Sequence, residues 1–449
     1  MDCKPCGVKM ALVEIQSLLE RADGSAVLRN ARLPAAMAPG GLPPVGDGLV
    51  AADLWLARGR IEAVTVRGRS GDQRPEIDLA EAMIWALPVD CHTHVDKGQT
   101  WGRTQNPDGS FQGAVAAGAK KGLSSFDEED LRTRTTFILD CAVAHGTAAI
   151  RSHVDAGQNN FDASFAVLSE LAEDYRDRLH IQLAPFTGVS EDPDFVAHLA
   201  DVAQSANSGV LSSFLYSDPS LEPFLDLVFT LAQSNGLELD FHADELLDAN
   251  SHCLRAVAKA ALRHKFDAPI MVGHACALSV QDRDTVSRTL DLVSEAGIAI
   301  VALPLCNVYL QDRQTGSPRQ RGIAPLHEIA AQGIPVAIAS DNVRDHFHAY
   351  GDMNLPELYR QATHLMHLDH PVGNWPATVS TTAAALIGRP DLGKLDAGGP
   401  ADMIIFPARN WSEFCARPTD ARVLLRGGKV HSSLPPEFSR LDGLKDMEI

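Results

Sequence analysis

Residues 270–274 read IMVGH, residues 279–296 read SVQDRDTVSRTLDLVSEA, and residues 299–304 read AIVALP. The two short runs are almost wholly apolar, which is typical of strands buried on both faces in a parallel sheet. The longer segment between them mixes polar and apolar residues with the period of an amphipathic helix. Together they predict a strand–helix–strand unit, the element from which parallel sheets are built.

The same alternation continues in both directions along the chain. Helical segments separate eight strand-like runs, which we expect at residues 82–88, 148–153, 180–185, 209–215, 238–242, 270–274, 299–304 and 336–340. Eight strand–helix units in succession predict an α/β fold, the (β/α)8 or TIM barrel.

The two ends of the chain have a different character. Residues 25–82 and 391–449 contain Gly, Pro and alternating apolar residues, a pattern typical of short antiparallel strands. We expect them to form the two parts of one small β-sandwich domain, the second part ending in a C-terminal tail. The expected organisation is completed by an N-terminal extension at residues 1–24 and a catalytic barrel at residues 83–390.

The composition excludes several classes of partner. The 39 Lys and Arg residues against 58 Asp and Glu residues give a formal net charge of −19, which disfavours nucleic acid and anionic membranes. The sequence has neither a run of about 20 apolar residues nor a basic and then apolar N-terminal signal. Its eight cysteines are scattered, so we expect no disulfide framework and a reduced, cytoplasmic protein.

Histidines and a carboxylate stand where several predicted strands end, the edge at which barrel active sites are built. His92 and His94 are two residues apart, so in an extended segment both imidazoles point to the same side. His242, His274 and Asp341 end three further strands. A single such residue is more often a cap or part of the core, but five on one face predict a metal site. Three imidazoles and a carboxylate suit Zn²⁺ or Fe²⁺ better than Ca²⁺ or Mg²⁺.

Longer motifs make the chain resemble the amidohydrolase superfamily and, within it, the cytosine deaminase-like group. The motifs are residues 92–98 (HTHVDKG), 241–245 (FHADE), 273–274 (GH), 307–313 (NVYLQDR), 321–323 (RGI) and 340–345 (SDNVRD). The strings at 307–313 and 321–323 are the narrowest of these, and they look like those of bacterial cytosine and 5-methylcytosine deaminases.

This resemblance implies a metal centre with a single ion. Many relatives bridge two metal ions with a carboxylated lysine, but here no lysine lies between Lys121 and Lys259. We therefore expect one divalent transition metal ion per subunit, Zn or Fe. Its expected ligands are His92, His94, His242 and Asp341.

The resemblance also implies a reaction, the hydrolytic deamination of a free aminopyrimidine of the cytosine or 5-methylcytosine type. Metal-bound hydroxide would attack the ring carbon that bears the amine, and ammonia would leave. Asp341 and His274 could take the proton of the water, and Glu245 would protonate first the ring nitrogen and then the leaving amine. Glu245 could instead be an ordinary acidic residue at a helix start.

Three further residues are expected to contact the substrate. Phe347 stands where cytosine deaminases place an aromatic ring against the pyrimidine, Asn342 replaces a second Asp of those enzymes, and Lys97 could shape the mouth of the site. The chain also lacks the Gln that cytosine deaminases carry after the third strand, where residues 182–188 read QLAPFTG. The choice of heterocycle therefore stays open.

Two other functions also stay open. The same metal chemistry could open a cyclic amide or cleave another C–N bond, and retention of the ring would separate that reaction from deamination. A non-catalytic metal-binding barrel is expected to lack a ligand or the acid, whereas His92, His94, His242, Glu245, His274 and Asp341 are all present. The expected partners are a small heterocyclic substrate and, by resemblance, further copies of the chain in a homo-oligomer.

Overall fold

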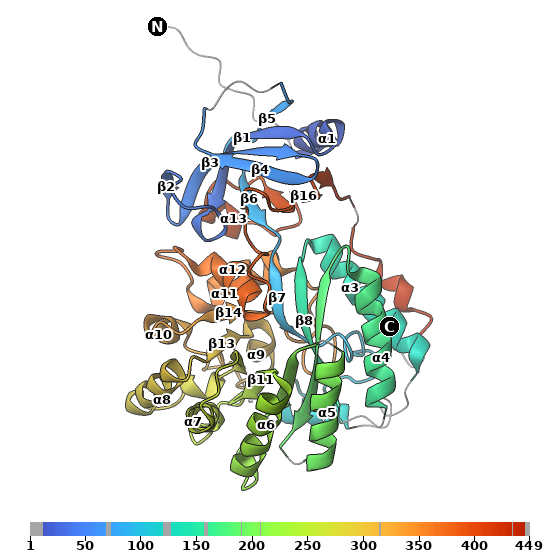
Figure 1. Cartoon of the computed structure of the whole chain (residues 1–449), viewed down its shortest axis with the longest axis vertical. Coiled ribbons are helices and arrows are strands. Elements are labelled where there is room, and N and C mark those ends of the chain that lie inside the picture. Colours follow the sequence, from blue (N-terminus) through green and yellow to red (C-terminus); the bar gives the residue numbers. More distant parts are fainter. Residues whose placement is uncertain are drawn as a thin grey trace. The chain divides into compact units, whose positions relative to one another are not determined.

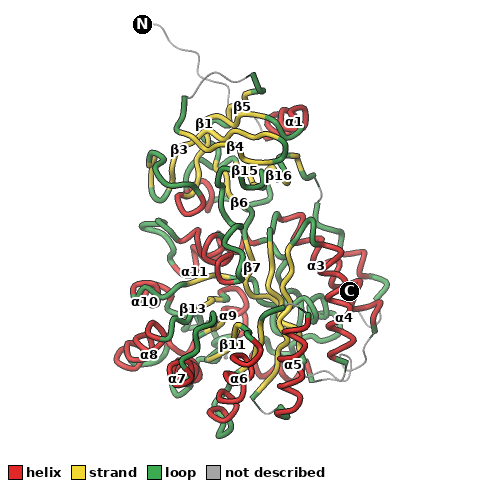
Figure 2. Tube along the Cα trace, viewed as in Figure 1, coloured by secondary structure: helices red, strands yellow, loops and turns green. Residues whose placement is uncertain are grey.

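The computed structural model describes residues 12–68, 73–119, 127–156, 160–189, 191–206, 208–313, 316–432 and 434–444. The chain forms two compact units. One comprises Met1–Pro88, Tyr359–Thr381 and Pro390–Leu434, and the other Val89–Leu358, Thr382–Arg389 and Pro435–Ile449. Each unit is built around its own sheet, which can be followed as yellow segments in Figure 2.

The sheet of the larger unit is the expected barrel. Its eight strands are parallel and lie side by side in chain order, from β7 to β14 (Figure 1). A parallel bridge between Thr93 and Asp341 brings the chain beyond the last strand against the first, so the cylinder is nearly closed. The strands are β7 (Val89–Thr93), β8 (Ala149–Asp155), β9 (His180–Gly188), β10 (Val210–Phe214), β11 (Glu238–Ala243), β12 (Ile270–His274), β13 (Ala299–Ala302) and β14 (Val336–Ile338).

Amphipathic helices follow the strands and bury one stripe each. In α6 (Leu221–Asn235) the buried residues include Phe224, Val228 and Ala232, at intervals of four, and Gly236 ends the helix in the left-handed conformation at φ 65°. The other helices of this unit are α2 (Phe111–Gly118), α3 (Glu128–His145), α4 (Phe161–Tyr175), α5 (Pro193–Ser205), α7 (Cys253–His264), α8 (Arg283–Glu295), α9 (Pro304–Leu310) and α10 (Leu326–Ala331).

The prediction that residues 82–88 form the first barrel strand is wrong. Met83–Ala86 forms β6, which pairs with β1 and with β15 in the other sheet, and the barrel begins only at Val89. All four residues of β6 are buried, so their hydropathy resembles that of a barrel strand. The run ends before Pro88, which has no amide hydrogen for a sheet. Which sheet a short apolar run joins depends on distant partners that hydropathy does not show.

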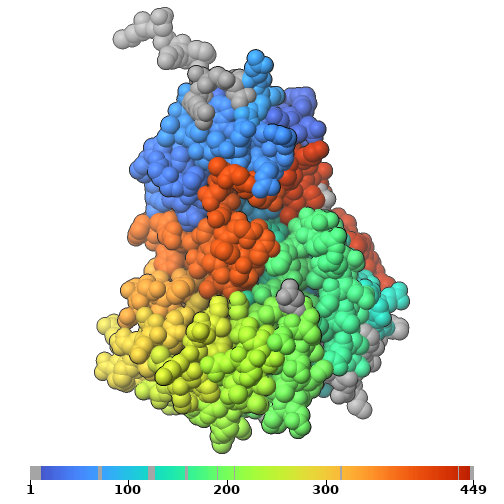
Figure 3. All heavy atoms as spheres, in the orientation of Figure 1, coloured from blue at the N-terminus to red at the C-terminus, as the bar shows by residue number. Residues whose placement is uncertain are grey.

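The smaller unit joins the two ends of the chain in one mixed sheet of nine strands. β6 pairs antiparallel with β15, and the N-terminal and C-terminal segments, blue and red in Figure 3, lie side by side. Two pairings, β1 with β5 and β1 with β6, are parallel rather than antiparallel as expected. The strands are β1 (Ala26–Pro34), β2 (Pro44–Gly46), β3 (Leu49–Ala57), β4 (Arg60–Thr65), β5 (Glu76–Asp78), β6 (Met83–Ala86), β15 (Met403–Phe406), β16 (Val423–Arg426) and β17 (Lys429–Val430).

An aromatic cluster forms part of the core of the smaller unit. Trp85 of β6 stacks on Phe414 with ring centroids 4.9 Å apart and meets Tyr359 edge-on at 5.3 Å. Phe414 belongs to α13 (Trp411–Cys415) and Tyr359 to α11 (Leu355–Met366), so this core draws on a segment that we expected in the barrel. α12 (Thr381–Leu386) follows in the chain.

The N-terminal extension is described in part. Its residues 12–22 form α1 (Leu12–Ala22), which buries Ile15 and Leu19, while residues 1–11 lie outside the described part of the chain. None of the helices in the described ranges combines the length and the apolar character that a membrane span requires.

Candidate active site

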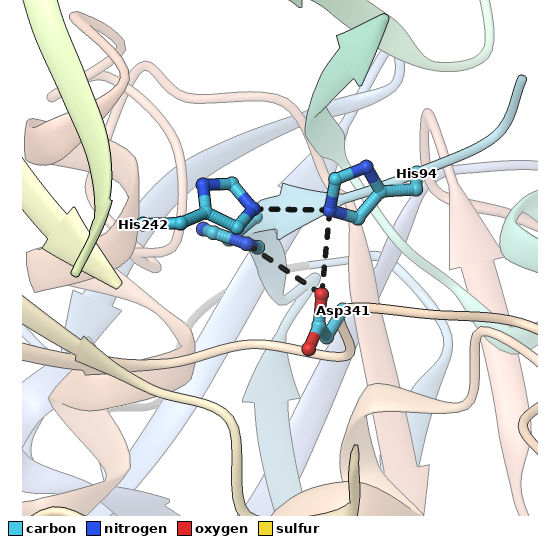
Figure 4. A group of neighbouring side chains, drawn as sticks. His94, His242 and Asp341 are labelled. Atoms are coloured by element: carbon cyan, nitrogen blue, oxygen red, sulfur yellow. Dashed lines mark hydrogen bonds and ion pairs between the residues drawn. The ribbon is translucent and has the colours of Figure 1, made fainter. Parts of the chain in front are cut away.

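Four side chains meet at the carboxyl end of the barrel. His92 lies in β7, His94 directly follows it, His242 lies in β11 and Asp341 follows β14. His94 Nε2 is 3.1 Å from His242 Nε2 and 3.4 Å from Asp341 Oδ1 (Figure 4). His92 Nε2 is 3.6 Å from the same oxygen. One ligand atom from each residue lies within 4.8 Å of the others, and all four residues are buried.

Backbone bonds hold Asp341 against the first strand. Its amide donates to the carbonyl of His92 at 2.9 Å, and its carbonyl accepts from the amide of His94 at 3.2 Å and from Thr93 Oγ1 at 2.8 Å. Asp341 has φ 64°, in the left-handed region that residues other than glycine rarely adopt. The three bonds fix this conformation and place the carboxylate beside the two imidazoles.

The polar atoms of this group fit a divalent cation. Among the described residues, His92 Nε2 and Asp341 Oδ2 are buried without a hydrogen-bond partner. Burial lowers the pKa of His94 to about 3 and that of His242 well below its usual value, so both imidazoles are neutral, as metal ligands must be. Three imidazoles and one carboxylate, facing one another and short of partners, are a donor set for a divalent transition metal.

A second His–Asp group lies behind His92 but does not suit another cation. His153 Nε2 is 3.3 Å from His92 Nδ1 and 3.9 Å from Asp240 Oδ2. The fully buried Arg151 already pairs with Asp240, at 3.2 Å, and with Glu238, at 2.6 Å. Because a guanidinium next to Asp240 would repel a metal ion, this group is better described as a support that holds the ring of His92.

A cavity of about 280 Å³ adjoins the group of four. Its walls carry the aromatic rings of Phe111, Phe186, Phe214 and Phe347, which suit a flat apolar ligand. The Lys97 ammonium lies 4.9 Å from the ring centroid of Phe347. The expected site residues that line the cavity are His94, Lys97, His242, Glu245, His274, Asp341, Asn342 and Phe347, while His92 does not line it.

Two buried groups of the cavity are suited to proton transfer. Burial and then the negative charge of Asp341 raise the pKa of Glu245 well above its usual value, which favours the protonated carboxyl. Burial lowers the pKa of His274 to about 3, which leaves a neutral imidazole. Glu245 Oε1 is 3.7 Å from His274 Nδ1. Glu245 is 7% exposed and lies well before α7, which begins at Cys253, so the alternative of an exposed helix-start residue does not hold.

Sequence reasoning gave no individual role to several residues around this cavity. Asn307 and Gln311 touch His274 and Glu245, and the only signal for them was the narrow string at residues 307–313. Phe111 comes from the connection after β7, and Phe214 ends β10. Nothing in the sequence distinguishes these two phenylalanines from core residues.

Comparison with known proteins agrees with this architecture. A family model described as "Amidohydrolase family" matches residues 193–431. The pterin deaminase of Rhizobium rhizogenes is 42% identical over 420 residues, covering 93% of this chain and 96% of that protein. The N-isopropylammelide isopropyl amidohydrolase of Pseudomonas sp. is 20% identical and covers 85% of this chain and 91% of its own.

The fold is also that of a solved enzyme. The crystal structure of 5-methylcytosine deaminase from Klebsiella pneumoniae superimposes with a TM-score of 0.78 at 23% identity, covering 92% of this chain and 98% of that one. The chain is accordingly a hydrolase of C–N bonds other than peptide bonds. With a family match over half its length and a 42% identical relative along nearly all of it, the chain belongs to the amidohydrolase family.

Proposed function

We propose that this protein is a metal-dependent deaminase of an aminated heterocycle whose reacting ring is an aminopyrimidine. The observation that carries the proposal is one aromatic cavity that adjoins both a His–Asp donor set suited to a cation and the buried Glu245, whose pKa is raised well above its usual value. The 42% identical relative is named for deaminating pterin, which is bicyclic and contains an aminopyrimidine ring. We therefore place pterins first among the candidate substrates, and the monocyclic cytosine or 5-methylcytosine expected from the sequence second.

The residues of the site divide into groups that hold, position and move protons. His92, His94, His242 and Asp341 would hold the ion, either Zn or Fe. When bound, such an ion supplies hydroxide from water at neutral pH. In deamination the amine-bearing carbon gains an oxygen and loses ammonia, while the ring stays intact.

Protons for these steps come from the chain itself. Glu245 would donate its proton to the ring nitrogen, take up the proton that the added hydroxyl loses as the carbonyl forms, and pass that proton to the departing amine. The water proton held by Asp341 or His274 would then restore the acid. Asp341 Oδ2 and His274 Nε2 have no hydrogen-bond partner among the described residues, so both are available to receive the proton of the attacking water. In this scheme Glu245 is the general acid, and Asp341 and His274 are the candidates for the general base.

The remaining contacts would orient the ring. Phe347 offers a flat face, and Lys97 beside it could donate to a ring carbonyl. Asn342 is already engaged, because its Nδ2 donates to Asp345 Oδ2 at 2.8 Å. We therefore assign Asn342 a smaller part in binding than Phe347 or Lys97.

Ammonia release from a panel of heterocycles tests the function. Metal-loaded protein should convert a pterin to its deaminated, ring-intact product with one ammonia per turnover, and chelator-treated protein should not. Cytosine, 5-methylcytosine and isocytosine complete the panel. A ring-opened product would instead support the alternative, a hydrolase of a cyclic amide or another C–N bond, and silence from protein with its ion bound would contradict deamination.

Gly188 gives a prediction about substrate size. It lies two residues beyond Phe186 on β9, so it shares the face on which Phe186 reaches to 4.5 Å from the ring of His242. A Cβ built on Gly188 meets nothing within 4 Å, and the residue lines the cavity. The Gly188→Leu variant should lower kcat/KM for a pterin about tenfold or more, because a leucine would occupy space that a second ring needs.

The monocyclic substrate is the internal control for that variant. We expect its kcat/KM to change by less than about threefold, since one ring leaves the Gly188 side of the cavity empty. Equal losses for one-ring and two-ring substrates would contradict this assignment of the cavity.

Three statements remain predictions from the sequence. They are a cytoplasmic location, a homo-oligomeric state, and a catalytic role for the barrel domain.

A further inference from the structure

None of the proposed metal ligands lies in the string at residues 307–313, so its role in the structure needs another explanation. Asn307 lies in α9 (Pro304–Leu310), and Gln311 follows one helical turn later. The main-chain amide of Gln311 donates to the main-chain carbonyl of Asn307 at 2.9 Å. Asn307 is 0% and Gln311 6% exposed. The NH2 group of each amide side chain finds a partner at the carboxyl end of a barrel strand, whereas Asn307 Oδ1 is buried without a hydrogen-bond partner among the described residues.

Each amide side chain reaches one of the two proton-transfer residues. Asn307 Nδ2 lies 3.1 Å from His274 Nδ1, and Gln311 Nε2 donates to the main-chain carbonyl of Glu245 at 2.7 Å. One turn of α9 therefore touches the ends of β11 and β12 at the same time. The Asn307 contact occupies Nδ1 of His274 and leaves its Nε2, which is buried and without a partner among the described residues.

The two residues held in this way lie in backbone that needs support. His274 and Ala275 both have positive φ, at 73° and 52°, and Asp244, next to Glu245, has φ 55°. The carboxylate of Asp244 accepts hydrogen bonds from the amides of Cys253 and Leu254, at 2.8 and 3.0 Å, which fastens one side of the loop to α7. Gln311 fastens the other side. Among the described residues, the ion-pair contact of the Glu245 carboxyl is the 3.7 Å approach to His274, so main-chain bonds must hold this carboxyl in place.

The string at residues 321–323 completes this arrangement. Gly322 has φ 71°, and a Cβ there would lie 2.3 Å from Cβ of Gln311. Asp312, next to Gln311, accepts a hydrogen bond from the amide of Gln320 at 2.8 Å, which folds residues 319–322 back onto the end of α9. Only glycine fits against Gln311 at this distance.

We propose that Asn307 and Gln311 are positioning residues that together set the distance and orientation between the His274 imidazole and the Glu245 carboxyl. This rests on the proposed function, in which these two groups move the protons of the reaction. Neither amide lines the cavity, so both act through another residue. Their loss should therefore slow the chemical step and spare substrate binding.

Steady-state kinetics of two variants test this inference. Gln311→Met keeps length and removes the donor, and Asn307→Ala removes the contact to His274. Because a displacement of about 1 Å at a reacting group costs about 100-fold, we expect kcat to fall about 10- to 100-fold in each. KM should stay within about threefold, and metal content and Tm close to wild type. Val308→Ala is the matched control, because Val308 belongs to the same helix but is 38% exposed.

The double variant adds a readout that unrelated structural damage would not give. Since the two amides hold one pair of groups, the combined loss in kcat should be smaller than the product of the single losses. Fully multiplicative losses, an unchanged kcat in both single variants, or a rise in KM that alone accounts for the slower rate would each overturn the inference.

Crystal structures of the metal-loaded variants keep this test separate from the test of the substrate. If the wild type turns over no heterocycle, the proposed function fails. The inference is then tested only by the positions of Glu245 and His274 in the crystal structures. A displaced Glu245 main chain in Gln311→Met and a rotated His274 ring in Asn307→Ala support the inference. If both groups stay where they are in the wild type, it is overturned.

Discussion

Replacing Glu245 by Gln should lower kcat by about 1,000-fold while the ion stays bound. General acid–base groups contribute about 10²- to 10⁴-fold to rate, and this carboxyl would serve both the ring nitrogen and the leaving amine. The amide of Gln has the size of the carboxylic acid and can donate a hydrogen bond, but it cannot give up a proton. Burial raises the pKa of Glu245 well above its usual value, which favours the protonated form that a proton donor needs.

The measurement is ammonia release under single-turnover and steady-state conditions, with metal content determined on the same sample. Glu222→Gln is a matched control, since the Glu222 side chain is 57% exposed on α6 and does not line the cavity. A Glu245→Gln variant with more than about a tenth of wild-type kcat would exclude Glu245 as the acid.

Removing the Asp341 carboxylate should remove the ion itself. Asp341→Ala deletes the carboxylate of the group of four and leaves its three imidazoles. Loss of a residue that merely orients a ligand already costs about 10- to 100-fold in metal affinity, so we expect a loss greater than about 100-fold here. Activity should vanish with the ion, and the Tm should no longer respond to added metal.

Competition with a chromogenic chelator measures this affinity directly, and thermal unfolding with and without Zn²⁺ gives the second readout. Asp177→Asn is the control, because the Asp177 side chain is 91% exposed. Wild-type metal affinity in Asp341→Ala would show that the ion, if there is one, lies elsewhere.

Much of this architecture was accessible from the sequence, for a physical reason. The carboxyl ends of parallel strands converge on one edge, so residues that end different strands become neighbours without any knowledge of loops. His92, His242 and Asp341 were found in this way, and the structure brings them together. Hydropathy located seven of the eight barrel strands for a similar reason, because burial on both faces gives a continuous apolar run.

The rest depended on contacts between distant segments. Met83–Ala86 is as apolar as a barrel strand, and only its pairing with β15 assigns it to the other sheet. Asn307 and Gln311 belong to the string at residues 307–313, which the sequence points out. Their roles can be inferred only from their distances to His274 and Glu245. The aromatic wall of the cavity could not be predicted either, because Phe111 reaches the cavity from a connection whose path the sequence does not determine.

The contact between Thr93 and Asp341, the seam at which the barrel closes, also determines at which stage of folding a cation can bind. The bond between Thr93 Oγ1 and the Asp341 carbonyl joins residues 248 positions apart, and the carboxylate at that seam is one of the four metal-binding groups. A nascent chain that has not yet reached β14 can offer histidines to an ion but not the enclosed set. Contacts between such distant residues form late, because closing a long loop costs much chain entropy. The ion would then act on the final closure of the cylinder and favour the completed barrel over every partly built one.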